Sequence, residues 1–131
     1  QMCIRDSMNA ITIDGTVVTT PRHLVTSEGL PITTFRMFHR TPLIEGRPLM
    51  ETQFFTVTSF RQLATNASLS IEKGDRVLVT GRLRIRDWEN AGNHSTNVEI
   101  EASHICHDLN HGASFFRPNA SLVPTETEET T

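Results

Sequence analysis

The chain has 131 residues, a formal net charge of −3 and a hydrophobic content of 37%. This size and composition predict one soluble globular domain with an appended tail, because the chain is too short for two full domains. No apolar run reaches the roughly 18 residues that a membrane span needs, and no stretch resembles a signal peptide. Cys3 and Cys106 are too few for a disulfide framework, which fits a reducing compartment and predicts a cytoplasmic location.

The charges are distributed unevenly along the chain. Residues 22–86 hold ten Arg or Lys against five Asp or Glu, whereas residues 87–131 hold eight acidic residues and one arginine. The middle of the chain is therefore basic although the whole is acidic, and a basic segment can form an electrostatic footprint for a polyanion. Eleven of the twelve basic residues are Arg, whose planar guanidinium both stacks on rings and pairs with phosphate in a bidentate fork.

The two ends of the chain join no periodic pattern. The run 2–7 resembles a translated sequencing-adapter prefix, so residues 1–7 are excluded from the reasoning about the fold. Residues 118–131 are rich in Thr, Glu, Ser and Pro, and periodicity is already lost after residue 109. We therefore expect a folded domain over 8–109 and a disordered acidic tail over 110–131.

Between these ends, apolar and polar residues alternate over several segments, which predicts strands. Gly15 is expected to end the first strand, which resumes at Val17 past a bulge, and Gly81 indicates a second bulge. A short extended piece is expected at 23–25, a turn at 27–29, and polar loops at 41–51 and 89–96. The main strands are predicted over 9–14, 31–40, 53–60, 77–88 and 97–102.

One helix is predicted over 61–73. Leu63, Ala67 and Ile71 follow a spacing of i, i+4, i+8, and Gly74 is placed to cap the helix in a left-handed conformation. Five strands with one helix between the third and the fourth is the order of the OB-fold, a small all-β barrel.

The fourth predicted strand has two different faces. Leu83 and Ile85 point toward one side, while Arg82, Arg84, Arg86 and Trp88 point toward the other. Guanidinium groups pair with phosphate oxygens and an indole ring stacks on any unpaired base, so this surface suits a nucleic acid. The alternative is an amphipathic edge strand whose arginines only keep it soluble.

The third predicted strand carries aromatic rings on both faces. Phe55 and Val57 share the face expected in the core, while Phe54 and Phe60 lie with Thr56 on the other. Two rings beside hydroxyl groups indicate a stacking platform. Alternatively, these rings pack under a neighbouring loop, as most aromatic side chains in proteins are buried.

No catalytic constellation is visible, and no cofactor or metal is expected. The exception to weigh is the group formed by His104, Cys106, His107 and His111, in which His107 and His111 could share a helical face and bind zinc. A structural zinc site usually has a recognisable Cys/His signature, which this stretch lacks. A polar stretch after the last strand is the simpler interpretation.

Several segments together resemble the bacterial single-stranded DNA-binding protein family, most closely its actinobacterial branch. The resemblance extends over most of the chain, from Met8 to about Leu109, and rests on the order and spacing of the segments. They are Asn9, Gly15 and Pro21, the turn 27–29, and the runs 35–37, 68–77, 79–89, 98–102 and 107–109.

The resemblance implies that Phe54, Phe60 and Trp88 stack on bases and that Arg82, Arg84 and Arg86 form a basic path, with Thr56, Arg36 and Arg40 completing the expected DNA-binding set. It also implies a nucleoid-associated homotetramer that protects single-stranded DNA during replication, recombination or repair. RNA binding, or a barrel used only for protein contacts, remain the alternatives.

The chain departs from the family pattern at three places. Residues 39–53 contain no aromatic residue where the family often has one, and Cys106 stands where a glycine is expected. The acidic segment 124–131 also lacks the terminal hydrophobic pair with which family members recruit replication and repair proteins. We therefore expect that the protein binds DNA, whereas its recruitment of replication and repair proteins is doubtful.

Overall fold

The computed structural model describes residues 10–39, 43–44, 47–48, 54–90 and 92–119, with the backbone alone described at 43–44, 47–48, 86–90 and 93–96. The predicted prefix 1–7, residue Arg40 and most of the acidic tail lie outside these residues. In chain order the elements are β1 (Ala10–Val17), β2 (Arg22–Val25), β3 (Pro31–Phe38), β4 (Leu43–Ile44), β5 (Arg47–Pro48), β6 (Phe54–Phe60), α2 (Arg61–Ser70), β7 (Arg76–Asn90) and β8 (Asn93–His107).

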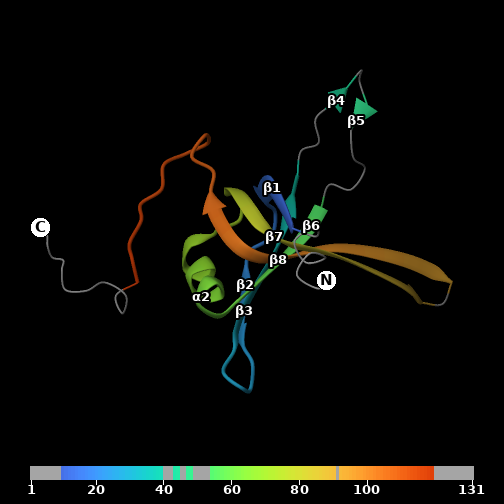
Figure 1. Cartoon of the computed structure of the whole chain (residues 1–131), viewed down its shortest axis with the longest axis horizontal. Helices are drawn as coiled ribbons and strands as arrows, with labels where there is room; N and C mark the ends of the chain where they lie inside the picture. The colour runs from blue at the N-terminus through green and yellow to red at the C-terminus, as the bar shows by residue number, and fades with distance from the viewer. Residues whose placement is uncertain (1–9, 40–42, 45–46, 49–53, 91, 120–131) are drawn as a thin grey trace, which may run out of the picture.

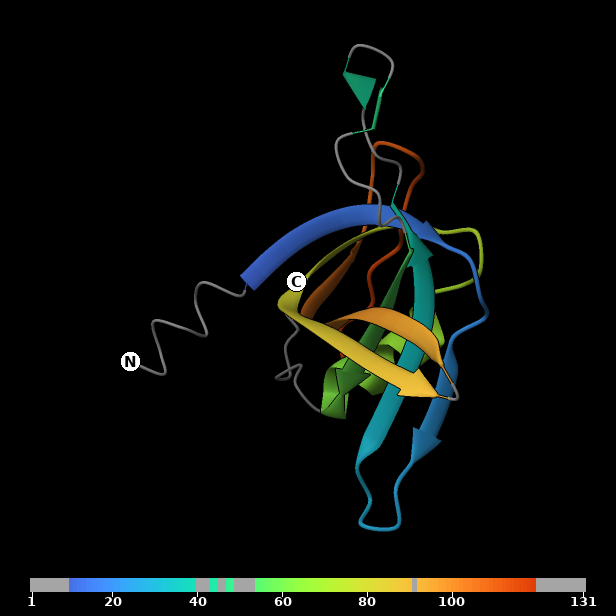
Figure 2. The ribbon, with the colours of Figure 1, turned by 90° about the vertical axis from the view of Figure 1, so that its right-hand side faces the viewer.

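Within the described part of the chain, five strands pair into a closed ring (Figures 1 and 2). β1 pairs with β7, β7 with β8, β6 with β3 and β3 with β1, all antiparallel, while β8 and β6 pair in parallel. β2 extends the sheet beyond β3. The helix α2 lies between β6 and β7, so the predicted OB-fold order is confirmed.

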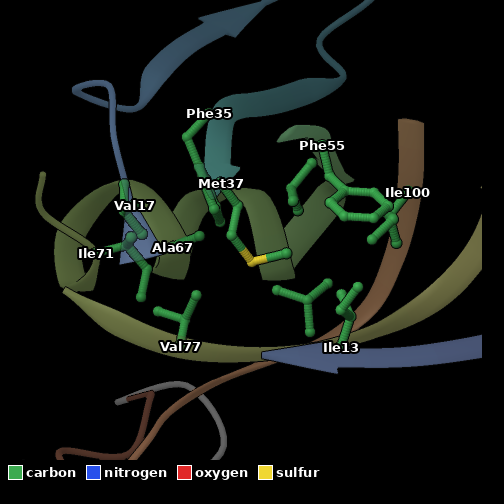
Figure 3. Close-up of a cluster of buried hydrophobic side chains, with 11 residues drawn as sticks. Ile13, Val17, Phe35, Met37, Phe55, Ala67, Ile71, Val77 and Ile100 are labelled. Carbon is green, nitrogen blue, oxygen red and sulfur yellow. The ribbon is translucent and has the colours of Figure 1, made fainter. Parts of the chain in front are cut away.

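The inside of the ring is filled by the residues that the alternation placed inward (Figure 3). Phe35, Met37, Val57 and Ile100 are buried, and Ala67 of α2 packs against the same cluster. Because successive strand residues point to opposite sides, a core of this kind leaves every second residue of β3, β6, β7 and β8 facing outward. That outward face is where the functional residues were expected.

Helix α2 ends earlier than predicted. It stops at Ser70, and Ile71 is already extended although its side chain is buried in the core. Gly74 has a positive φ of 97° but lies in the turn before β7, three residues beyond the end of the helix cap. The i, i+4, i+8 spacing extended past the true end because Ile71 continues the buried stripe without continuing the helix.

Two buried hydroxyl groups fix α2 on the barrel. Thr33 Oγ1 donates to the carbonyl of Ala64 at 2.7 Å, and Ser59 Oγ donates to the carbonyl of Thr33 at 3.2 Å. Since the Thr33 hydroxyl is already a donor, His23 Nδ1, 2.8 Å from it, donates its proton to that oxygen. The helix, β3 and β6 are thus joined by polar contacts, which keeps the outward sides of these strands in a fixed relation.

The hairpin of β7 and β8 is much longer than the sequence indicated. The expected loop over 89–96 is mostly paired strand, and the last strand begins at Asn93 and continues to His107, beyond the predicted range of 97–102. Figure 1 shows the far part of this hairpin projecting away from the barrel. The part of the hairpin that projects from the barrel does not pack on the core, so it carries polar residues. Its amino-acid composition is therefore similar to that of a loop.

Two glycines mark places where strands approach closely. β1 continues through Gly15, contrary to the expected break. A Cβ at this position would lie 2.5 Å from the carbonyl oxygen of Phe38, so the close approach of the two strands requires a glycine here. At Gly81 a Cβ would collide with the carbonyl of Glu101, and the register between β7 and β8 shifts at this point, which confirms the predicted bulge.

The segment expected as a loop at 41–51 contains β4 and β5, which pair with each other. None of the described helices is long and apolar enough to cross a membrane.

Candidate nucleic-acid interface

The candidate interface is the outward side of four neighbouring strands, β3, β6, β8 and β7. The register places the side chains in rows, because directly paired residues point to the same side of a sheet. Arg36 pairs with Thr56, Thr56 with Glu99, and Glu99 with Arg84, so one row crosses all four strands. We call this surface the outer face; its described side chains include Thr34, Arg36, Phe38, Phe54, Thr56, Thr58, Phe60, Arg82, Arg84, Asn97, Glu99 and Glu101.

An aromatic cluster occupies one end of the outer face. Phe38 and Phe54 are directly paired across β3 and β6, with ring centroids 5.1 Å apart and an interplanar angle of 58°. The guanidinium carbon of Arg36 lies 5.4 Å from the centroid of the Phe54 ring, within the distance of a cation–π contact. Phe54 nevertheless remains 46% exposed. Its ring is held in place by two neighbours and still presents surface to solvent.

Phe60 lies on the same side as Phe54 but at the opposite end of β6, about 20 Å away by the rise of a strand. It is half-buried and precedes the first residue of α2. The burial alternative therefore holds in part for Phe60 and not for Phe54. Between them, Thr56 donates its hydroxyl to Asn97 Oδ1 at 3.3 Å. The two rings are too far apart to contact the same base, so each ring can stack only on a different base.

The arginines of β7 do not form a purely basic path. Glu101 is paired with Arg82 and Glu99 with Arg84, so two carboxylates of β8 lie on the outer face beside the arginines. Arg84 Nη2 and Glu101 Oε1 form an ion pair at 3.0 Å, with the two side chains 49% and 36% exposed. The charges of Arg82 and Arg84 are thus largely balanced on the surface where they lie.

Sequence reasoning missed these two carboxylates although a signal for them was present. Val98, Ile100 and Ala102 alternate with Glu99 and Glu101 along the predicted strand, so an inward apolar side already sets the two carboxylates outward. What the sequence did not give was the register between β7 and β8, which brings the carboxylates level with the arginines. The pairing connects residues nearly twenty positions apart and depends on the length of the hairpin.

The structure describes the other predicted residues of β3 and β7 to different extents. Ile85, expected on the side of β7 opposite the arginines, is 61% exposed. It pairs with Val98, one residue beyond Glu99, where the pairing of β8 with β6 ends, so it lies past the closed ring of strands. Arg86 and Trp88 continue β7 opposite Asn97 and Ser95, but their side chains lie outside the described part, as does Arg40. Arg36 is exposed on the outer face as predicted, although it was not expected to lie against Phe54.

The histidines and Cys106 do not assemble into a metal site. Cys106 and His107 are successive residues of β8 and so point to opposite sides, and residues 109–110 form a turn, not the helix that would have set His107 and His111 on one face. His107 Nε2 lies 3.1 Å from Asp75 Oδ2, and His107 Nδ1 lies 2.7 Å from Ser114 Oγ. Among the described residues, no group of three or more His, Cys, Asp or Glu is arranged to hold a metal ion.

Instead, this stretch fastens the chain after β8 to the barrel. His111 lies 3.2 Å from Arg76 through its Nε2, and Asp108 accepts hydrogen bonds from the backbone and side chain of Asn110, both at 3.0 Å. The hydrogen bond from the backbone N–H of Asn110 is the largest cause that lowers the pKa of the Asp108 carboxyl. Desolvation opposes it, and the side chain of Asn110 and the charges of His111 and Arg76 lower the pKa further. His107 and His111, the two residues weighed as zinc ligands on one helical face, therefore contact Asp75, Ser114 and Arg76 instead.

The outer face offers planar rings, guanidinium groups and hydroxyls on an open surface. Such a combination can stack unpaired bases and contact a phosphate backbone without requiring a particular sequence. Its chemistry is that of a binding surface.

The comparisons with known proteins agree with this assignment. Single-stranded DNA-binding protein 2 of Tropheryma whipplei (strain Twist) is 43% identical over 125 residues, covering 92% of this chain and 82% of the relative. The small single-stranded DNA-binding protein from Streptomyces coelicolor superposes with a TM-score of 0.68 at 38% identity, covering 79% of this chain and 96% of that one. The second single-stranded DNA-binding protein from Mycobacterium smegmatis shares the fold, with a TM-score of 0.66 at 23% identity.

The match to a family is equally extensive. Residues 8–108 match the model of the Single-strand binding protein family. The resemblance inferred from the sequence, including its actinobacterial character, is confirmed. The ring of five strands with α2 between β6 and β7, the outer face and these relatives lead to one conclusion: the chain belongs to the Single-strand binding protein family.

Proposed function

We propose that this protein binds single-stranded DNA without strong sequence preference and performs no chemical reaction on it. The observation that carries the proposal is the Phe54 ring, which is held by Phe38 and Arg36 and yet is 46% exposed on an open strand face. A ring held in this way presents an aromatic face to solvent, and bases of any identity can stack on it.

In this proposal the single strand crosses the barrel with its bases toward Phe54 and Phe60 of β6 and its phosphates toward Arg82 and Arg84 of β7, and a further base stacks on Trp88 farther along β7. Phe54, Phe60 and Trp88 are the stacking residues, and Arg36, Arg40, Arg82, Arg84 and Arg86 contact the backbone, with Thr56 beside them. The spacing supports this division, since neighbouring strands are about 4.8 Å apart and β7 therefore lies about 10 Å from β6. A nucleotide spans a comparable length from its phosphate to its base.

The wider role follows from the family. We propose a domain spanning 8–109 that assembles as a homotetramer, is cytoplasmic and nucleoid-associated, and protects single strands during replication, recombination and repair. Size-exclusion chromatography with light scattering measures the assembly directly. A mass near four times 14.7 kDa supports the tetramer, and a monomer at micromolar concentration contradicts it.

The binding proposal is tested with a fluorescently labelled oligo-dT of about 30 nucleotides by anisotropy. We expect tight binding that weakens as salt is added, with a slope near −0.7 in log–log form per phosphate contact. A duplex of the same length is expected to compete poorly because its bases are already stacked on each other. Oligo-U as competitor measures the RNA alternative, which equal competition would favour.

A further inference from the structure

The centre of the outer face carries negative charge, although the outer face is proposed to bind a polyanion. Glu99 and Glu101 stand on β8, between the threonines of β6 and the arginines of β7. We call these two residues the carboxylate strip. A phosphate placed over the strip would meet repulsion, so its presence needs a physical explanation.

The strip holds an arginine in the absence of DNA. Glu101 Oε1 accepts from Arg84 Nη2 at 3.0 Å, and Asn97 Nδ2 donates to Glu99 Oε2 at 2.8 Å. A carboxylate presents the same kind of anionic oxygen to a guanidinium as a phosphate does. Both partners of the ion pair are well exposed to solvent, so the pair is weak and can be exchanged.

We infer that Glu101 occupies, in the protein without DNA, the position on Arg84 that a backbone phosphate takes when DNA binds. The inference rests on the proposed function and adds to it a residue that limits affinity. Binding then exchanges one anionic partner of Arg84 for another. The gain from the phosphate contact is reduced by the loss of the internal pair and by repulsion between Glu101 and the incoming phosphate.

The strip also favours one arrangement of the ligand. A single strand can place its phosphates at β7 and its bases at β6 and β3, and so crosses the carboxylates with its neutral sugars and bases. A duplex carries two charged backbones and would set one of them closer to the strip. Repulsive elements of this kind raise specificity at some cost in affinity. The carboxylates therefore contribute to discrimination against duplex DNA.

The test is Glu101→Gln, which keeps the shape of the side chain and removes its charge. Glu72→Gln is the matched control, because Glu72 is an exposed carboxylate in the turn after α2, away from the outer face. For oligo-dT at about 0.1 M salt we expect Glu101→Gln to bind about three- to fivefold more tightly than wild type, the range of an exposed ion pair. The gain for duplex should be larger, and Glu72→Gln should change neither affinity by more than about 1.5-fold.

A double-mutant cycle separates the ion pair from general charge. In an Arg84→Gln background, Glu101→Gln should give a clearly smaller gain than in wild type, because the ion pair with Arg84 is already absent. Unchanged or weaker oligo-dT binding by a folded Glu101→Gln variant would overturn the inference, as would a gain equal to that of Glu72→Gln. The proposed function fails separately, if wild type binds duplex as well as oligo-dT.

Discussion

The phenyl rings of Phe38 and Phe54 lie against each other across β3 and β6, with centroids 5.1 Å apart. Cross-strand aromatic pairs at this distance contribute about 0.5–1.5 kcal/mol beyond the burial of their area. Because Phe38 is half-buried and Phe54 is 46% exposed, the first ring acts as a support and the second as a platform. A ring held in one orientation loses less entropy when a base stacks on it.

Replacing Phe54 by Ala should weaken binding of oligo-dT by about 1–3 kcal/mol, the value of one lost base stack. Replacing Phe38 by Ala should weaken it by about 1 kcal/mol or less, since only the orientation of Phe54 is affected. Anisotropy titration measures both, and circular dichroism verifies the fold. Leu69→Ala, at a position on α2 that is 79% exposed, serves as the control and should bind normally. Normal binding by Phe54→Ala would remove the platform from the site.

Phe55→Ala should have the opposite profile. Phe55 is 3% exposed and belongs to the core cluster, so its loss should lower the free energy of unfolding by about 3–5 kcal/mol. Urea denaturation of Phe54→Ala and Phe55→Ala compares two neighbouring residues on opposite sides of β6. If Phe54→Ala proved the more unstable of the two, the assignment of the inner and outer sides would be wrong.

Gly81→Ala tests the bulge between β7 and β8. The added Cβ would meet the backbone of Glu101 and Ala102, and overpacking of this kind costs about 1–3 kcal/mol. Gly112→Ala is a matched control, because nothing lies within 4 Å of a Cβ at that position. We expect a lower urea midpoint for Gly81→Ala alone. Equal midpoints for the two variants would show that the strands are not in close contact at Gly81.

The carboxyl of Asp108 should have a pKa below the ordinary value of Asp. The hydrogen bond from the Asn110 backbone N–H is the main cause that lowers the pKa of its carboxyl in the folded state. The carboxylate therefore stabilises the turn above the pKa that Asp has in the unfolded chain, and this contribution is lost as the pH falls through the lower folded value. The amide NMR shift of Asn110 reports the titration, and Asp108→Asn should abolish it. A transition at or above the usual range of Asp would contradict the hydrogen-bonded turn.

The faces of the barrel strands could be predicted from the sequence because they depend on local alternation. Phe35 and Met37 on β3, and Phe55 and Val57 on β6, are buried as the pattern indicated. The alternation is a direct consequence of strand geometry and needs no knowledge of neighbouring strands. The order of the predicted elements, five strands with one helix between the third and the fourth, then indicated the OB-fold.

The prediction failed where a residue's environment depends on distant parts of the chain. Ile85 alternates correctly but is exposed, since whether a core lies beneath β7 depends on how far the hairpin projects. The pairing of Arg84 with Glu101 depends on the register of two long strands and on the bulge at Gly81. The polar composition at 89–96 indicated a loop. A hairpin that projects into solvent is also polar, so composition alone does not distinguish the two structures.

The central claim, that the outer face binds single-stranded DNA, is tested most directly by intrinsic fluorescence. Trp88 is the only tryptophan and the chain has no tyrosine, so the emission reports on the far part of β7 and on little else. Titration of the wild-type protein with oligo-dT should quench this emission strongly, because a base stacked on the indole changes its surroundings. The quenching should be reversed by salt, as counterion release requires. Duplex DNA of equal length should quench only weakly. Emission that stays unchanged at saturating oligo-dT would remove Trp88 from the site, and equal quenching by the duplex would contradict single-strand binding by this surface.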